Sequence, residues 1–297
     1  MNLTARRVEH QHTERGVLPV YATGVVVQPW DSYSDTDHAT WGTLYRRQRQ
    51  LLEGRACQAF LDAQDAMGMD AGRIPRFDEL NVALQAATGW TLIGVEGLLP
   101  EADFFGHLAN RRFPVTWWIR RPEQIDYIAE PDLFHDLFGH VPLLMDPVFA
   151  RFMQAYGEGG LRALSEFGPE ALQDLTRLYW YTVEFGLINT PQGLRIYGAG
   201  IVSSASESVH SLESAAPNRI GFDLERVMRT RYRIDTFQKT YFVIDSFEAL
   251  MAATASDFAP VYRQMRKLAP LPASSVLDSD RVYQRGSGEG WLEEGDI

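Results

Sequence analysis

The sequence predicts one mainly helical α+β domain with a few short β-strands. Apolar residues recur at helical spacing in long segments such as DPVFARFMQAYG and PEALQDLTRLYWYTVEFGLI. Short apolar, β-branched or aromatic runs such as WTLIGVEG, VTWWI and TYFVIDSF are scattered between these segments. Because strands and helices do not alternate regularly, a doubly wound parallel sheet is not expected.

The first half of the chain should begin with an arm, residues 1–33, followed by helices. Ser34 and Asp37 form a capping-box pattern, which predicts a helix that continues through Leu51. Further helices are predicted in RACQAFLDAQDAM and in FDELNVALQAAT, the latter ended by Gly89. WTLIGVEG and VTWWI are predicted strands, and ADFFGHLANRR is a predicted helix between them.

The second half continues the same domain, predicted to span residues 34–268. DPVFARFMQAYG and PEALQDLTRLYWYTVEFGLI are predicted helices, and Pro169 suits the first turn of the second one. RIYGAGIVSS predicts a strand and a loop, TYFVIDSF a strand, and SDFAPVYRQMRKL a helix. Pro, Ser, Gly and Asp dominate residues 269–297, so these residues are predicted to form a mobile C-terminal tail.

Composition indicates a protein that acts on small molecules. The 297 residues, 45% of them hydrophobic, are enough for a substantial core. A net charge of −11 disfavours nucleic acid and anionic membranes as partners, and no apolar run approaches the roughly 20 residues that cross a bilayer. The N-terminal segment has no apolar stretch of signal-peptide type. Since the only cysteine is Cys57, which suits a reducing compartment, a cytoplasmic location is expected.

Two histidines stand inside the apolar segment PDLFHDLFGHVPLL. His135 and His140 are five residues apart, which separates them by about 140° around a regular helix. They share a face only if the helix ends or bulges between them, and Gly139 followed by Pro142 permits such a change. Zinc peptidases space their two histidines by four and place a glutamate beside the first. The pair alone therefore leaves a metal site and hydrogen-bonded core histidines as alternatives.

Glu184, in TRLYWYTVEFGLI, is a third candidate ligand. An ionised carboxylate among such apolar side chains needs a counter-charge or a metal ion. Alternatively, Glu184 lies on an exposed helix face or pairs with Arg177 or Arg195. Two imidazoles and one carboxylate form the facial triad that holds Fe(II) and leaves positions open for other ligands. Zinc could bind the same three groups.

Three motifs in this order, HDLFGHVPLL, YWYTVEFGLI and IYGAGIVSS, resemble the catalytic domain of the pterin-dependent aromatic amino acid hydroxylases. The resemblance extends from about Ser34 to Leu268 and is greatest to bacterial members that act on phenylalanine. It implies a non-haem Fe(II) held by His135, His140 and Glu184. It also implies a monooxygenase that uses dioxygen and tetrahydrobiopterin, or a related tetrahydropterin. A monomer is expected, because the sequence shows neither the regulatory domain nor the tetramerisation helix of the animal members.

The resemblance also assigns residues to the amino acid substrate. Arg120, in TWWIRRP, matches an arginine that binds the substrate carboxylate, a contact that suits the guanidinium fork. Members that act on tryptophan carry phenylalanine at the position of Trp180, and members that act on tyrosine carry aspartate at that of Val243. Phenylalanine, hydroxylated to tyrosine, is therefore the expected substrate. Further residues implied near the substrate or the iron are Ser203, Ser204 and Tyr179.

The pterin site is likewise implied by the resemblance. Phe104 should stack on the pterin, and the backbone of residues 97–99 should meet its polar edge. Asp136 stands where the animal members carry glutamate, so its contact with the pterin should differ in reach. Ile128 and Ala129 replace a threonine and a proline of the animal members near the substrate, so details of the amino acid pocket should differ. The implied cofactor-binding residues are Gly97, Leu98, Leu99, Phe104 and Asp136.

Two other functions are alternatives to a hydroxylase. A zinc hydrolase could use the same three ligands with Asp136 as its base, and metal analysis with ferrous reactivation would distinguish it. A non-catalytic regulator that binds pterin or an amino acid needs no facial triad, and it would bind its ligand equally well after His135→Ala.

Overall fold

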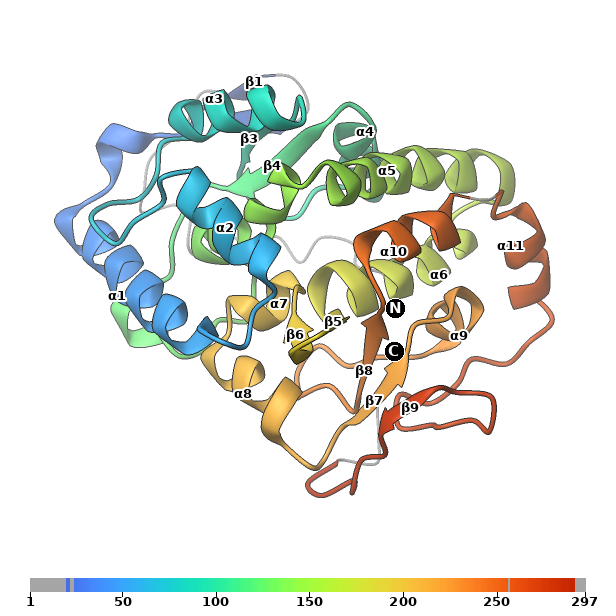
Figure 1. Ribbon diagram of the computed structural model, residues 1–297. Helices are drawn as coiled ribbons and strands as arrows, with labels where there is room; N and C mark the ends of the chain where they lie inside the picture. Colours follow the sequence, from blue (N-terminus) through green and yellow to red (C-terminus); the bar gives the residue numbers. More distant parts are fainter. Residues whose placement is uncertain (1–19, 22–23, 256, 292–297) are drawn as a thin grey trace. The chain divides into compact units, whose positions relative to one another are not determined.

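The computed structural model describes residues 20–21, 24–255 and 257–291, and its helices and short strands are shown in Figure 1. The chain forms two compact units, Met1–Arg46 with Ala63–Glu158 and Arg47–Asp62 with Gly159–Ile297, and each is described by itself. Helix prevails and the strands are short, so the predicted fold class is confirmed. Among the described residues, no helix is both long enough and apolar enough to span a membrane.

The first unit contains a four-stranded sheet in the order β1-β2-β3-β4. The strands β1 (Val20–Tyr21), β2 (Val25–Val26) and β3 (Thr91–Val95) are antiparallel neighbours. β3 runs parallel to β4 (Arg112–Thr116), and α4 (Glu101–Ala109) makes the crossover between them (Figure 1). The predicted strand–helix–strand order of this region is confirmed.

Three predicted helices of this region begin and end close to their predicted positions, but the helix predicted over DPVFARFMQAYG continues beyond Gly157 to Phe167. The Ser34 hydroxyl accepts a hydrogen bond from Asp37 N at 3.2 Å, and the Asp37 carboxylate accepts one from Ser34 N at 2.9 Å, so the capping box is confirmed. Gly89, at φ 77°, ends the third helix by donating to Leu84 O. Helical segments with residues in this unit are α1 (Asp35–Leu52), α2 (Gln58–Ala66), α3 (Phe77–Ala87), α5 (Pro147–Phe167), a π-helix (His135–His140) and 3-10 turns at Trp30–Ser32, Pro122–Gln124 and Pro142–Met145.

Aromatic packing in the first unit holds the histidine segment against α1. Trp41 and Tyr45 of α1 contact Phe134 and Phe138, with ring centroids 5.5 and 5.6 Å apart. Phe134 and Phe138 stack on each other at 4.8 Å. All four side chains are buried, so the backbone on either side of His135 is fixed by the core.

The second unit contains a five-stranded sheet in the order β6-β5-β8-β7-β9. Its central strand β8 runs parallel to both neighbours and is buried along its whole length, which explains the continuous apolar run TYFVI. The strands are β5 (Leu187–Thr190), β6 (Gly193–Ile196), β7 (Asn218–Gly221), β8 (Thr240–Ile244) and β9 (Val282–Gln284).

Two predictions for the second unit were wrong. The helix predicted over PEALQDLTRLYWYTVEFGLI ends at Glu184, and its last two residues, Leu187 and Ile188, belong to β5. RIYGAGIVSS supplies the end of β6, but Ala199–Val202 form a short helix, α7, rather than a loop. Gly198 O accepts hydrogen bonds from Ile201 N and Val202 N, which closes this turn. Parts of α1, α2 and α5 belong to this unit. Its other helical segments are α6 (Glu170–Tyr179), a π-helix (Trp180–Glu184), α7 (Ala199–Val202), α8 (Ala205–Glu213), α9 (Leu224–Arg229), α10 (Phe247–Thr254) and α11 (Ala259–Met265).

The segment predicted to be a mobile tail makes specific contacts over its described part. β9 lies in this segment and pairs antiparallel with β7. Asp280 forms an ion pair with Arg226 at 3.0 Å, and both side chains are only 5% exposed. These contacts attach Asp280 and β9 to the second unit, whereas residues 292–297 lie outside the described part. The boundaries at residues 33 and 268 stay predictions.

Candidate metal centre

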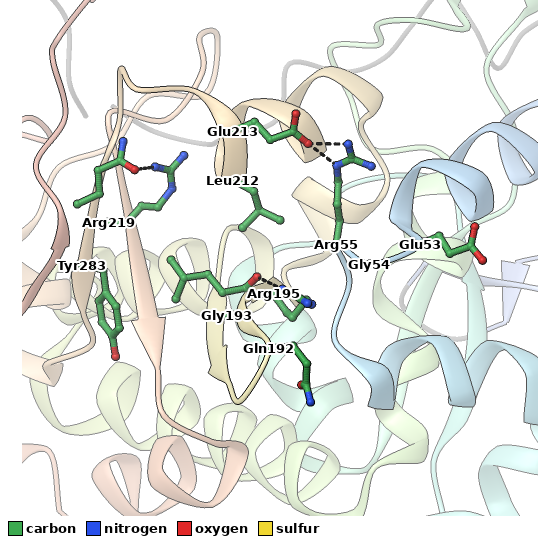
Figure 2. Close-up of a pocket in the computed structure, with 12 residues that line it drawn as sticks. Glu53, Gly54, Arg55, Gln192, Gly193, Arg195, Leu212, Glu213, Arg219 and Tyr283 are labelled. Atoms are coloured by element: carbon green, nitrogen blue, oxygen red, sulfur yellow. Dashed lines mark hydrogen bonds and ion pairs between the residues drawn. The ribbon is translucent and has the colours of Figure 1, made fainter.

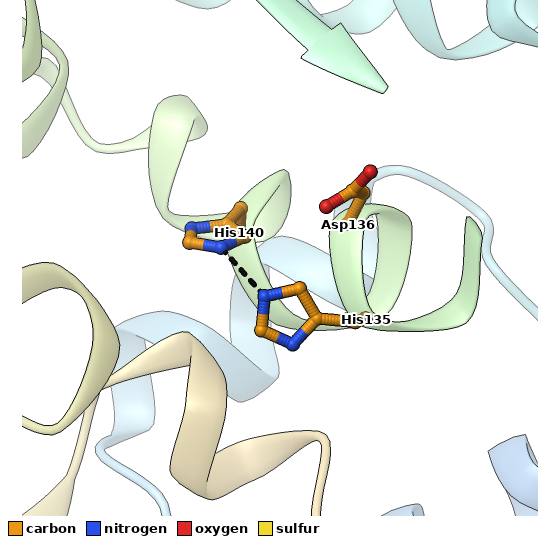
Figure 3. A group of neighbouring side chains, drawn as sticks. All are labelled: His135, Asp136 and His140. Atoms are coloured by element: carbon orange, nitrogen blue, oxygen red, sulfur yellow. Dashed lines mark hydrogen bonds between the residues drawn. The ribbon is translucent and has the colours of Figure 1, made fainter. Parts of the chain in front are cut away.

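The two histidines lie at the ends of a single π-helical turn, His135–His140. Its hydrogen bonding is of the i to i+5 type, with Val141 N donating to Asp136 O at 3.3 Å. This wider turn brings the residue at i+5 over residue i, so His135 and His140 share a face, as Figure 3 shows. The bulge that the spacing required is therefore present.

The geometry of the imidazole pair fits a shared metal ion. The two Nε2 atoms are 3.0 Å apart, and the rings meet edge to face. Metal–nitrogen bonds of about 2.0–2.1 Å place two ligands at right angles about 3 Å apart. His140 is buried against Phe113, and His135 is half-buried. In the absence of a metal ion, these two Nε2 atoms could form a single hydrogen bond, in which one ring donates its proton to the other.

Asp136 lies beside the pair but is engaged elsewhere. Its carboxylate accepts a hydrogen bond from Thr116 N at the end of β4, 2.7 Å away. Burial raises the pKa of Asp136 to about 7, although His140 and the Thr116 amide act in the opposite direction. One carboxylate oxygen lies within 4.8 Å of the histidine nitrogens, so Asp136 is itself a possible ligand. Figure 3 shows its side chain directed away from the point where the rings meet. Its assignment to the pterin stays a prediction.

Arg120 forms a buried ion pair that the sequence did not suggest. Its Nε and Nη2 atoms each donate to one oxygen of Asp132 at 2.9 Å, with Arg120 6% exposed and Asp132 fully buried. Asp132 also accepts hydrogen bonds from Arg120 N and from His135 N. Asp132 therefore orients the guanidinium and fixes the start of the π-helix. Among the described residues, none accepts a hydrogen bond from Arg120 Nη1, which leaves this nitrogen available to a ligand.

Glu184 also lies on a π-helical turn, in the second unit. Phe185 N donates to Trp180 O at 2.8 Å, again an i to i+5 bond. The motif IYGAG packs closely against this turn. A Cβ atom added to its first glycine, Gly198, would lie only 2.4 Å from Glu184 O, so no larger residue fits there. Glu184 is half-buried.

The arginines considered as partners of Glu184 have other contacts. Arg177 pairs with Asp174 at 2.9 Å, and Arg195 donates to Leu194 O at 2.9 Å. The role of Glu184 as a metal ligand stays a prediction.

Trp180 is held in one orientation by its neighbours. Its ring stacks on Tyr232 at 4.3 Å and lies 4.6 Å from Phe185. The indole N–H donates to Gln238 Oε1 at 2.9 Å, and Gln238 Nε2 donates to Arg233 O at 2.9 Å, so the amide orientation is fixed. A rigid indole of this kind suits the wall of a binding site.

Behind Gln238 lies a buried polar group that sequence analysis missed. Gln238 N and the Tyr241 hydroxyl both donate to Glu207 Oε1. Burial raises the pKa of Glu207 to about 7 and that of Tyr241 well above its usual value. No local pattern reveals this group, because Glu207 and Tyr241 are 34 residues apart.

The remaining predicted residues have structural contacts of their own. The Ser203 hydroxyl donates to Ala199 O at 2.8 Å, and Ser204 accepts from Glu207 N at the start of α8. Val243 is fully buried in β8. Phe104 and Tyr179 are half-buried, and in the 97–99 loop Leu98 is exposed. Their roles toward iron, substrate and pterin stay predictions.

Comparisons with known proteins agree with this geometry. Residues 14–269 match the sequence family described as biopterin-dependent aromatic amino acid hydroxylase. The chain is 60% identical to a phenylalanine-4-hydroxylase from Chromobacterium violaceum, covering 91% of this chain and 90% of that protein. It is 62% identical to a phenylalanine-4-hydroxylase from Ralstonia nicotianae, covering 91% and 85%. The iron- and phenylalanine-bound crystal structure of the Chromobacterium enzyme aligns with a TM-score of 0.86 at 58% identity, covering 91% of this chain and 98% of that one.

Proposed function

The chain belongs to the biopterin-dependent aromatic amino acid hydroxylases, and we propose that it converts L-phenylalanine to L-tyrosine with dioxygen and a tetrahydropterin at a non-haem Fe(II). The observation that carries this proposal is the convergence of His135 and His140 on one face of a π-helical turn. Glu184 would be the third ligand, which gives the donor set of a facial triad. A zinc hydrolase and a non-catalytic regulator lack support from any relative described above.

The chain's own residues would perform binding and orientation. Iron and pterin together would supply the activation of dioxygen, while the three ligands leave the remaining iron positions open. Arg120, oriented by Asp132, would bind the substrate carboxylate through Nη1 and so set the position of the ring. The rigid Trp180 would form one wall of the ring site. The implied pterin residues are Phe104, Asp136 and the 97–99 backbone.

Product analysis tests the proposed function directly. The protein is loaded anaerobically with Fe(II) and given tetrahydrobiopterin, air and L-phenylalanine. We expect tyrosine to form in an amount that depends on both iron and pterin. Activity that persists with zinc in place of iron, or without pterin, would contradict the proposal.

The role of Arg120 predicts a selective effect on amino acid binding. Arg120→Lys keeps a cation beside Asp132 but loses the guanidinium fork. A hydrogen bond to a charged group contributes about 1.5–3 kcal/mol, so KM for phenylalanine should rise at least about tenfold. KM for the pterin should change little. Arg121→Lys, at the exposed neighbouring position, is the matched control and should leave both constants near their native values.

Substrate choice is predicted to favour phenylalanine over tyrosine and tryptophan. A tyrosine hydroxyl buried without a partner costs about 1–3 kcal/mol, which corresponds to roughly one to two factors of ten in kcat/KM. Val243→Asp should lower phenylalanine use. Because Val243 is fully buried in β8, unfolding of each variant is measured alongside, with Val243→Thr as the near-isosteric control. A higher kcat/KM for tyrosine or tryptophan in the native protein would refute this choice.

We further propose that the protein acts as a monomer in the cytoplasm, with small-molecule substrates and no nucleic acid or membrane partner. The charge of −11 and the single cysteine support this proposal. Light scattering of dilute protein tests the oligomeric state, and a stable tetramer would contradict it.

A further inference from the structure

The second unit contains a pocket that none of the proposed iron, substrate or pterin residues lines. Its volume is about 570 Å³, within the range of small-molecule sites. Its wall comes from segments distant in sequence: the turn after α1, the tip of the β5–β6 hairpin, the end of α8, and β7 and β9 (Figure 2).

Two of the three arginines that line this pocket, Arg195 and Arg219, form no ion pair with a carboxylate among the described residues. Arg219 is 2% exposed, yet its hydrogen bonds go to neutral oxygens only: Ser211 O at 2.6 Å, Ser214 O at 2.9 Å, His210 O and Gln284 Oε1. Burial lowers the pKa of Arg219, which reflects the cost of this charge. A buried cation that lacks a counter-ion favours an anion nearby.

Arg195 supplies an accessible guanidinium in the same pocket. It is half-buried, and its one hydrogen bond to the described residues goes to Leu194 O. Of the acidic groups in the wall, Glu213 is already paired with Arg55 at 2.6 Å. Glu53 is exposed, and Figure 2 shows its carboxylate at the edge of the group, directed away from Arg195. The pocket therefore has one more cation than anions, in a chain whose net charge is −11.

We propose that this pocket binds a small organic oxyanion, with its carboxylate or phosphate group on Arg195 and its carbon skeleton against Leu212 and Tyr283. A guanidinium fork binds both kinds of oxyanion through two parallel hydrogen bonds. The exposed Gln192 amide offers further donors, and the buried charge of Arg219 belongs to the wall of the same pocket and favours an anion there. The site is separate from the proposed reaction and does not depend on it.

Titration calorimetry on the iron-loaded full chain tests this proposal. Inorganic phosphate and succinate are titrated separately, in chloride buffer of matched ionic strength. We expect saturable binding of at least one anion with a stoichiometry of one, and Arg195→Gln should weaken it at least about tenfold. Arg263→Gln, at an exposed position on α11 outside the pocket, is the matched control and should bind like the native chain. Circular dichroism and hydroxylase activity verify that Arg195→Gln is folded.

The results distinguish between a phosphate and a carboxylate ligand, and between binding in this pocket and binding elsewhere. Saturable phosphate binding indicates a phosphate-bearing ligand, and saturable succinate binding indicates a carboxylate. No saturable heat with either anion overturns the proposal, as does equal weakening by Arg195→Gln and Arg263→Gln. Binding that disappears when iron is removed by a chelator belongs to the metal centre and also overturns it.

Discussion

Replacing any one of the three proposed ligands with alanine should remove most bound iron and nearly all hydroxylation. The side chains at issue are His135, His140 and Glu184. The two imidazole nitrogens are already 3.0 Å apart, so losing one leaves a site with too few donors to retain the ion. Mutation of a residue that only hydrogen-bonds to a metal ligand lowers metal affinity or activity about 10–100-fold. Loss of a ligand itself should lower both by a larger factor. Iron content by elemental analysis and tyrosine formation are measured on the same preparations.

Matched controls separate ligand loss from general damage. His107→Ala removes another buried imidazole of the first unit, and Glu166→Gln removes a carboxylate of the second unit. Both should retain iron. Full iron and full activity in Glu184→Ala would show that the triad assignment is wrong, and Asp136 would then be tested as the third ligand.

Asp132→Ala should destabilise the protein by about 3–5 kcal/mol, because it leaves the buried Arg120 guanidinium without its carboxylate. It also removes the acceptor for His135 N at the start of the π-helix. Urea denaturation followed by circular dichroism measures the loss, and iron content should fall in parallel. Glu79→Ala, which breaks the exposed Arg73–Glu79 pair, is the control and should cost at most about 1 kcal/mol.

A double variant distinguishes the loss of a pair from the cost of an unpaired charge. Arg120→Met with Asp132→Leu replaces the ion pair by apolar side chains, which is often neutral or stabilising at buried sites. We expect it to recover much of the stability lost in Asp132→Ala while still binding phenylalanine poorly. An Asp132→Ala loss below about 1 kcal/mol would contradict a structural role for the pair.

Features with short-range causes could be predicted from the sequence. The start of α1 depends on Ser34 and Asp37, which are three residues apart and bond to each other. The end of α3 depends on Gly89, whose positive φ costs glycine little. The histidine spacing showed that a regular helix could not serve both rings, and the structure contains the required bulge.

Contacts between distant segments were missed for the opposite reason. Asp132 and Arg120 are 12 residues apart, and Gln238 lies 58 residues from Trp180. No spacing rule relates such positions, since their approach depends on how strands and helices pack. The helix α7 was missed because it begins at Gly198, which packs against a distant turn: a Cβ atom at this position would lie 2.4 Å from Glu184 O.

The sequence by itself determined the class of fold, the family and the candidate ligands, because periodicity, capping and ordered motifs are properties of neighbouring residues. The tertiary structure decided how those residues are held. Asp132 orients Arg120, Gln238 orients Trp180, and the aromatic core around Phe134 and Phe138 fixes the π-helical turn. It also revealed an arginine-rich pocket whose wall comes from five separate segments. Such arrangements arise only when the folded chain buries charged and polar groups, which must then find partners far away in sequence.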